Sequence, residues 1–85
     1  MPIKTFFWRD YQGREVDLIL SKAEKLIPIE ITNSESISRK KIDNLGYFLA
    51  ENKEASFGLV VYGGELKIIK SQPKPIFCLP WWLWW

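Results

Sequence analysis

The stretch Leu26-Ile27-Pro28-Ile29-Glu30-Ile31-Thr32-Asn33 decides the fold of this chain. Its isoleucines recur at every second position, which is the period of a β-strand, so they share one face. Glu30 and Thr32 fall on the opposite face. A carboxylate within a buried strand is costly unless another group compensates its charge. The stretch therefore predicts a buried strand whose acidic residue has a specific partner.

A second acidic residue, Asp17, lies thirteen positions upstream of Glu30, in a segment from 14 to 21 that also alternates. The alternation predicts a strand with Val16, Leu18 and Leu20 on one face and Glu15, Asp17 and Ile19 on the other. If the two strands pair with their acidic faces aligned, Asp17 and Glu30 come within reach of one ion. The pair therefore predicts a site for a divalent cation.

The remaining elements follow from turn signals and helical spacing. Residues 5–10 are β-prone, and the turn Tyr11-Gln12-Gly13 predicts a hairpin with the segment 14–21. After a serine-rich loop with N-cap candidates, a helix is expected over 38–52. Gly63-Gly64 between 57–62 and 65–70 is typical of a two-residue hairpin. Residues 76–79 are expected as a short edge strand. The N-cap candidates are Ser34, Ser36 and Ser38; the apolar helix positions are Ile42, Leu45, Phe48 and Leu49.

These elements predict an α/β or α+β mixed sheet with about five strands and one main helix. The length of 85 residues allows one domain at most, expected over 1–80 with a tryptophan-rich tail over 81–85. The net charge of +2 gives no strong field toward nucleic acid or an anionic membrane. The absence of histidine excludes Ser-His-Asp triads and histidine zinc sites.

The cellular location expected from the sequence is the cytoplasm. Cys78 is the one cysteine, which excludes an intramolecular disulfide and fits a reducing compartment. With no histidine to activate it, Cys78 is expected as a small buried side chain without chemistry. No signal peptide or membrane-spanning run is visible, so the expected partners are DNA, a second copy of the chain or another protein.

Two carboxylates are the ligands that Mg²⁺ or Mn²⁺ would use here, with waters completing the shell. Such an ion polarises a phosphodiester and generates hydroxide, and a nearby lysine commonly stabilises the charge on phosphorus. The alternative is that both carboxylates are satisfied by Arg9, Arg14 or backbone donors. Spacing alone leaves these two interpretations about equal.

Short segments along nearly the whole chain, roughly from Phe6 to Trp81, together resemble one known module. The most specific part is the Glu-Val-Asp segment followed by Ile-Pro-Ile-Glu-Ile. The segments are Phe7-Trp8-Arg9-Asp10, Gly13-Arg14-Glu15-Val16-Asp17-Leu18-Ile19, Leu26-Ile27-Pro28-Ile29-Glu30-Ile31, Ile37-Ser38, Leu45, Phe48-Leu49, Tyr62-Gly63-Gly64 and Leu79-Pro80-Trp81.

The module that these segments resemble is the C-terminal domain of uncharacterised archaeal and bacterial AAA-type ATPases. That domain resembles a restriction-endonuclease-like fold of the PD-(D/E)xK type, related to archaeal Holliday-junction resolvases. The resemblance implies that Asp17 and Glu30 match the acidic metal ligands and that both belong to the catalytic motif. It also implies a helix before the first strand and an ATPase with a phosphate-binding loop, and these residues are expected to contain neither.

Thr32 occupies the position where the motif of these nucleases carries lysine. A threonine can form hydrogen bonds but supplies no positive charge. Lys40 or Lys41 could replace the missing lysine in space. Arg39, Lys40 and Lys41 otherwise form either a solvated helix start or a contact to nucleic-acid phosphates. Glu15 is expected as an exposed partner of Arg14 or Lys25, with a third metal ligand as the alternative.

The terminal indoles of Trp81, Trp82, Trp84 and Trp85 are expected to form an interface. They would cover the sheet face left bare by the absent helix, within one chain or across a dimer. The alternatives are a frayed tail and an interfacial membrane anchor.

The sequence predicts a nuclease-like domain without hydrolysis, acting in nucleic-acid association or protein assembly. The alternatives are an active Mg²⁺- or Mn²⁺-dependent DNA endonuclease completed in a dimer, and a pure dimerisation module.

Overall fold

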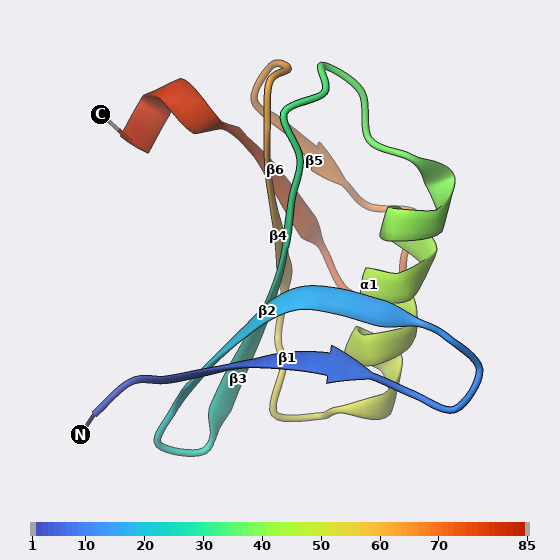
Figure 1. The fold of residues 1–85 in the computed structure, drawn as a ribbon, viewed down its shortest axis with the longest axis vertical. Coiled ribbons are helices and arrows are strands. Elements are labelled where there is room, and N and C mark those ends of the chain that lie inside the picture. Colours follow the sequence, from blue (N-terminus) through green and yellow to red (C-terminus); the bar gives the residue numbers. More distant parts are fainter. Residues whose placement is uncertain (1, 85) are drawn as a thin grey trace.

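One mixed sheet of six strands, with one long helix packed against one of its faces, forms the computed structural model, which describes residues 2–84 (Figure 1). This confirms the predicted α+β fold class. In chain order the elements are β1 (Lys4–Arg9), β2 (Glu15–Lys22), β3 (Lys25–Ile31), α1 (Arg39–Glu51), β4 (Gly58–Tyr62), β5 (Lys67–Ile69), β6 (Ile76–Pro80) and the 3₁₀ turn η1 (Trp81–Trp84).

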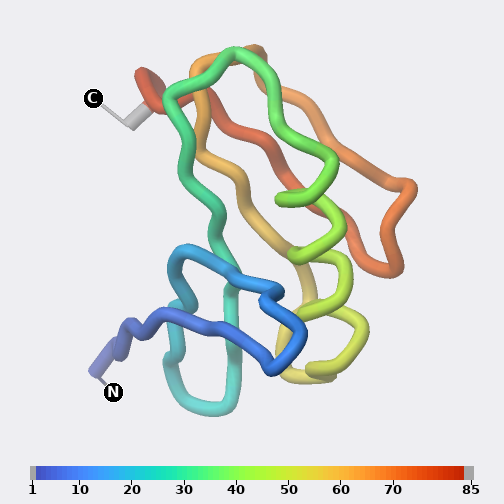
Figure 2. Tube along the Cα trace, turned by 45° about the vertical axis from the view of Figure 1, so that its right-hand side comes forward, coloured from blue at the N-terminus to red at the C-terminus, as the bar shows by residue number. Residues whose placement is uncertain are grey.

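The strand order is β1-β2-β3-β4-β6-β5, and the pairing changes direction at β3. Strands β1, β2 and β3 form an antiparallel meander, whereas β3, β4 and β6 are parallel and β5 is antiparallel to β6. Helix α1 carries the chain from β3 back to the start of β4, as a parallel connection requires. Figure 2 shows this crossover, with α1 in front of the parallel strands. Because β3 is shared, it joins the two halves of the sheet.

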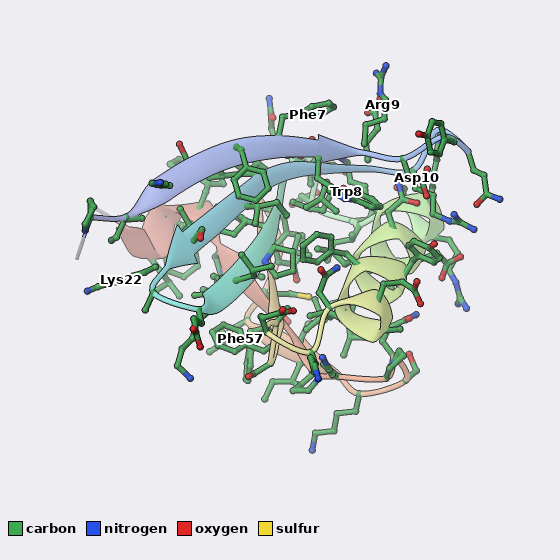
Figure 3. The ribbon with its side chains drawn as sticks, turned by 90° about the horizontal axis from the view of Figure 1, so that it is seen from below. Phe7, Trp8, Arg9, Asp10, Lys22 and Phe57 are labelled. Atoms are coloured by element: carbon green, nitrogen blue, oxygen red, sulfur yellow. The ribbon has the colours of Figure 1, made fainter. Side chains whose placement is uncertain are left out.

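Helix α1 confirms the predicted helix over 38–52. Ser38 is its N-cap, and the Ser38 hydroxyl accepts a hydrogen bond from the Lys41 N–H at 3.2 Å. The helix buries an apolar stripe against the sheet. Trp8 of β1 closes this core from above, with its indole edge-on to Phe48 at 5.3 Å between ring centroids (Figure 3). The buried apolar residues of α1 are Ile42, Leu45, Phe48 and Leu49.

The predicted hairpin at Gly63-Gly64 is wrong, since β4 and β5 do not pair and β6 lies between them. A two-residue hairpin turn of this kind needs a positive φ, and among the described glycines only Gly13 has one. Gly63 instead donates its N–H to the Ser34 carbonyl at 2.9 Å. A Cβ on Gly64 would lie 2.6 Å from the Glu35 carbonyl. Both glycines therefore serve a close approach to the loop before α1.

The predicted edge position of residues 76–79 is also wrong. Strand β6 lies inside the sheet, and the edge is the three-residue β5. Ile76 and Cys78 point into the core and are fully buried, while Phe77 and Leu79 point to the other face and are half-buried. A strand that is apolar on both faces is typical of a central position in a sheet.

A β-bulge in β2 corrects the predicted assignment of its two faces. Phe6 pairs with Ile19 and Trp8 with Val16, so one β1 residue faces both Asp17 and Leu18. The extra residue turns Val16 and Ile19 to the same side, and both are fully buried in the core. Simple alternation places them on opposite faces, so the expected grouping of Asp17 with Ile19 is wrong.

The sheet face opposite α1 is apolar and carries no helix of the described chain (Figure 1). Cross-strand pairing places one residue from each of five strands in a single row, namely Leu18, Ile29, Leu59, Phe77 and Ile68. We call this surface the outer face. Its further members, from the rows above and below, are Ile31, Val61 and Leu79, and Leu20 and Ile27.

Candidate functional site

The carboxylates of Asp17 and Glu30 meet where β2 and β3 separate. The last regular pair of the two strands is Leu18 with Ile29. Beyond it, the Asp17 N–H donates to Glu30 Oε1 at 2.8 Å, and the Ile31 N–H donates to Asp17 Oδ2 at 2.9 Å. Side-chain oxygens thus replace main-chain carbonyls as acceptors, which satisfies the strand ends. The predicted alignment of the two acidic residues at one point is present.

Lys41 supplies a positive charge to this pair from the first turns of α1. Its Nζ lies 3.3 Å from Glu30 Oε2 and 3.4 Å from Asp17 Oδ2. Of the two lysines considered as substitutes for the missing motif lysine, Lys41 is the one that contacts both carboxylates. Of the donors named in the alternative interpretation, the backbone donors are present, whereas Arg9 pairs with Glu15 and Arg14 with Asp10.

The electrostatics of the cluster follow from unequal burial. The side chain of Glu30 is 3% exposed, whereas those of Asp17 and Lys41 are about a third exposed. Burial raises the pKa of Glu30, and the neighbouring Asp17 charge adds to this, against the opposing effects of the Asp17 N–H and Lys41. Burial lowers the pKa of Lys41, but the charges of Glu30 and Asp17 outweigh it and raise the pKa overall.

A small cavity of about 190 Å³ opens over the cluster. Two of its lining residues were not expected from the sequence as site residues: Ser38, the helix N-cap, and the buried Asn44, one turn after Lys41. The sequence signal for both residues is their spacing from Lys41. Ser38 lies three residues before Lys41 and Asn44 three residues after it, and residues three apart lie on the same side of a helix. The complete lining is Glu15, Asp17, Glu30, Ser38, Lys40, Lys41 and Asn44.

Thr32 does not join this cavity. Its N–H donates to the Val61 carbonyl at 3.0 Å, and its hydroxyl accepts the Ser34 N–H at 3.2 Å. It lines a separate hollow with Ile31, Asn33, Val61 and Trp81. The motif's lysine position is therefore used to shape the loop that follows β3.

The three basic residues at the start of α1 have different surroundings. Arg39 pairs with Asp43 at 3.1 Å on the exposed side of the helix. Lys40 lines the cavity, and Lys41 holds the acidic pair. Glu15 reaches the cavity wall, but its carboxylate is bonded by Arg9 Nε at 2.9 Å, so neither Arg14 nor Lys25 is its partner. Lys40 is the cation at the mouth with the fewest competing contacts.

The donor chemistry suits a hard cation only in part. Two carboxylates at a cavity are appropriate for Mg²⁺ or Mn²⁺ with several waters. The residues that the structure describes contain no group of three or more acidic or cysteine side chains placed to hold a metal. The ammonium of Lys41 also occupies the point between the two carboxylates. A divalent cation bound by both carboxylates would have to displace Lys41.

The structure describes part of the predicted tryptophan interface. Trp81 and Trp82 follow β6 directly in η1 and are 47% and 55% exposed. Trp81 lies beside Ile31 and Val61, which places it at one end of the outer face. Figure 1 shows η1 on the side of the sheet opposite α1. The side chain of Trp84 and the whole of Trp85 lie outside the described residues.

No helix among residues 2–84 is long and apolar enough to cross a membrane.

Comparisons with known proteins give one match. No curated protein and no solved structure shows significant similarity to the chain. One family model, described as a domain of unknown function, DUF4143, matches residues 1–84. With nearly its whole length covered by that model, the chain belongs to the DUF4143 family.

Proposed function

We propose that the chain is a nuclease-like domain of the restriction-endonuclease type that associates with nucleic acid or a partner protein and does not hydrolyse phosphodiesters. The domain corresponds to the module that resembles the C-terminal part of AAA-type ATPases. The observation that carries the proposal is the position of Lys41 between the Asp17 and Glu30 carboxylates. An internal ammonium there offsets one of the two negative charges, at the position where a divalent cation would offset both.

The remaining contacts of the cluster support a structural role for both carboxylates. Glu30 Oε1 and Asp17 Oδ2 each accept a main-chain N–H from the opposite strand. Thr32 brings no charge to the site. A metal ion therefore has to compete against existing partners for both Glu30 oxygens and for Asp17 Oδ2.

A second function, an Mg²⁺- or Mn²⁺-dependent endonuclease, is favoured by a different observation. The contacts of Lys41 Nζ at 3.3 and 3.4 Å are longer than the roughly 2.7–2.9 Å of strong charge-assisted hydrogen bonds. Its side chain is also partly exposed. Lys41 can therefore withdraw to contact a phosphate, leaving Asp17 and Glu30 to a cation. In this alternative Lys41 performs the task of the motif lysine.

The variant Lys41→Gln separates the two functions. If Lys41 is the internal counter-ion, its removal frees the carboxylates, so Mn²⁺ affinity measured by electron paramagnetic resonance rises and DNA stays intact. If Lys41 is catalytic, the unmodified chain cleaves linear or branched DNA with Mn²⁺, and Lys41→Gln abolishes cleavage. Cleavage by the unmodified chain that Asp17→Asn abolishes would reject the non-hydrolytic function.

Association with nucleic acid is tested at the mouth of the cavity. A phosphate contact by Lys40 predicts that Lys40→Gln weakens DNA binding and reduces its salt dependence. Lys67→Gln, on the far edge strand β5, is the matched control and leaves both unchanged. Binding that is insensitive to both changes would assign any DNA contact to another surface.

A further inference from the structure

The outer face is the side of the sheet that α1 does not cover; Ile31 and Ile68 on it are about half exposed, whereas Ile29 in its central row is 7% exposed. Parallel strands are ordinarily covered on both faces, and the parallel strands β3, β4 and β6 have α1 on one face only. Here the central row crosses five strands without a polar side chain. An apolar row that crosses a sheet in this way is typical of an interaction surface.

The total accessible surface gives the same indication. The chain exposes 5878 Å², roughly 600 Å² more than the about 5,200 Å² expected for a folded monomer of 10.0 kDa. A standard interface removes about 800 Å² from each partner. The excess surface is therefore comparable to one partner's share of an interface.

We propose that the outer face pairs with the outer face of a second copy of this chain, forming a two-fold sheet-on-sheet dimer. This goes beyond the proposed function, because it names a surface and a partner and does not depend on the carboxylate site. The absence of charge argues for a second copy. The central row from Leu18 to Ile68 carries no charge that would repel an identical face, and the lysines near it, Lys22 and Lys25, lie at the β2–β3 turn.

The shape of the face also suits a two-fold axis. At the β2–β3 turn lies an apolar hollow of about 380 Å³, lined by Ile3, Leu20, Lys22, Ala23, Lys25 and Ile27. At the other end the exposed Trp81 and Trp82 project from η1. Figure 1 shows the turn and η1 at opposite ends of the same side of the sheet. A two-fold rotation places the tryptophans of each copy at the apolar hollow of its partner, so the same contact forms at both ends of the dimer.

Sedimentation equilibrium of the whole chain tests the dimer. The expected species has twice the 10.0 kDa mass of one chain. Ile31→Lys and Ile68→Lys place a charge on the face at residues that are 52% and 49% exposed in the single chain, so folding is spared. Each is expected to weaken dimerisation by about tenfold or more. Tyr11→Lys is the matched control, because Tyr11 is fully exposed in the turn between β1 and β2, where Arg14 stacks on Tyr47 of α1.

A chain that remains monomeric up to about 0.5 mM would overturn the proposal, since that concentration detects even millimolar affinity. Equal dimerisation by Ile31→Lys, Ile68→Lys and Tyr11→Lys would overturn it as well. The orientation is tested by cysteine pairs under oxidation. Trp82→Cys and Lys22→Cys are expected to form a disulfide when mixed, and neither with itself. Self-linked Trp82→Cys would contradict the two-fold arrangement.

Discussion

The Lys41 ammonium and the Glu30 carboxylate form the most deeply buried ion pair among the described residues, at 3.3 Å. The pair joins helix α1 to β3 and adds an ionic contact to the apolar packing between the two layers. Glu30 has exchanged water for this contact and for the Asp17 N–H. The cost of burying its charge therefore depends on Lys41.

Removing Lys41 is expected to destabilise the chain. In Lys41→Met the methylene stem is kept but the ammonium is lost, so Glu30 either stays charged without its partner or takes up a proton. We expect the free energy of unfolding at pH 7 to fall by about 1–3 kcal/mol, measured by urea denaturation. Lys40→Met, next in sequence, is the control and should change stability by less than about 0.5 kcal/mol. Equal losses in the two variants would contradict the role of Lys41.

The raised pKa of Glu30 predicts a specific pH dependence. Because the folded state binds this proton more tightly than the unfolded state, the stabilisation is complete below pH 4.5. It is lost as pH rises through the folded pKa. The free energy of unfolding of the wild type, relative to Glu30→Gln, should therefore decrease as pH rises from 4.5. A difference independent of pH in urea denaturation would show that Glu30 titrates as in the unfolded chain.

Two adjacent aromatic residues of β1 should respond in opposite ways to truncation. Trp8 points between the sheet and α1, whereas Phe7 points away from the helix and is 56% exposed (Figure 3). Trp8→Ala removes the edge-on contact with Phe48 and opens a cavity, so we expect a loss of about 3–5 kcal/mol in thermal or urea unfolding. Phe7→Ala should cost far less. A similar cost at both positions would mean that Phe7 is covered in solution.

The β2–β3 turn contains a position where glycine should be better than the natural residue. Ala23 has φ of +57°, the one positive value among the described non-glycine residues. An L-residue pays about 1–2 kcal/mol for this conformation. Ala23→Gly relieves that cost but adds freedom to the unfolded chain, so we expect a net gain of about 0.5–1 kcal/mol.

The control for this turn is Ala50→Gly on the exposed side of α1, where glycine should cost about 1 kcal/mol. Thermal unfolding of both variants gives the comparison. A loss of stability in Ala23→Gly would mean that the turn is not strained.

Local sequence patterns predict which segments form strands and helices better than they predict which strands lie next to each other in the sheet. Period-two alternation identifies β3, and helical spacing with Ser38 as cap identifies α1. The placement of β6 between β4 and β5 depends on contacts between distant segments, which no local pattern contains. Gly63-Gly64 misleads because a close backbone approach and a tight turn both require glycine.

The site shows the same division. The spacing of Asp17 and Glu30 predicts their meeting, but the bulge that releases the Asp17 N–H from the β1–β2 ladder has no signal in the sequence. From the sequence, Lys41 is one of two candidates for the missing motif lysine, because the groups that its side chain contacts depend on how α1 lies across the sheet. Thr32 shows why a motif is only part of a site, since the missing charge arrives from another element.

The bulge at Asp17 also makes this residue a reporter. Its amide proton is held by the carboxylate of Glu30, and that of Ile31 by the carboxylate of Asp17, whereas regular strand amides are held by main-chain carbonyls. Ionisation of that carboxylate strengthens the hydrogen bond, and protonation or capture by a cation weakens it. The chemical shift and exchange rate of one backbone amide therefore record the charge state of the whole cluster.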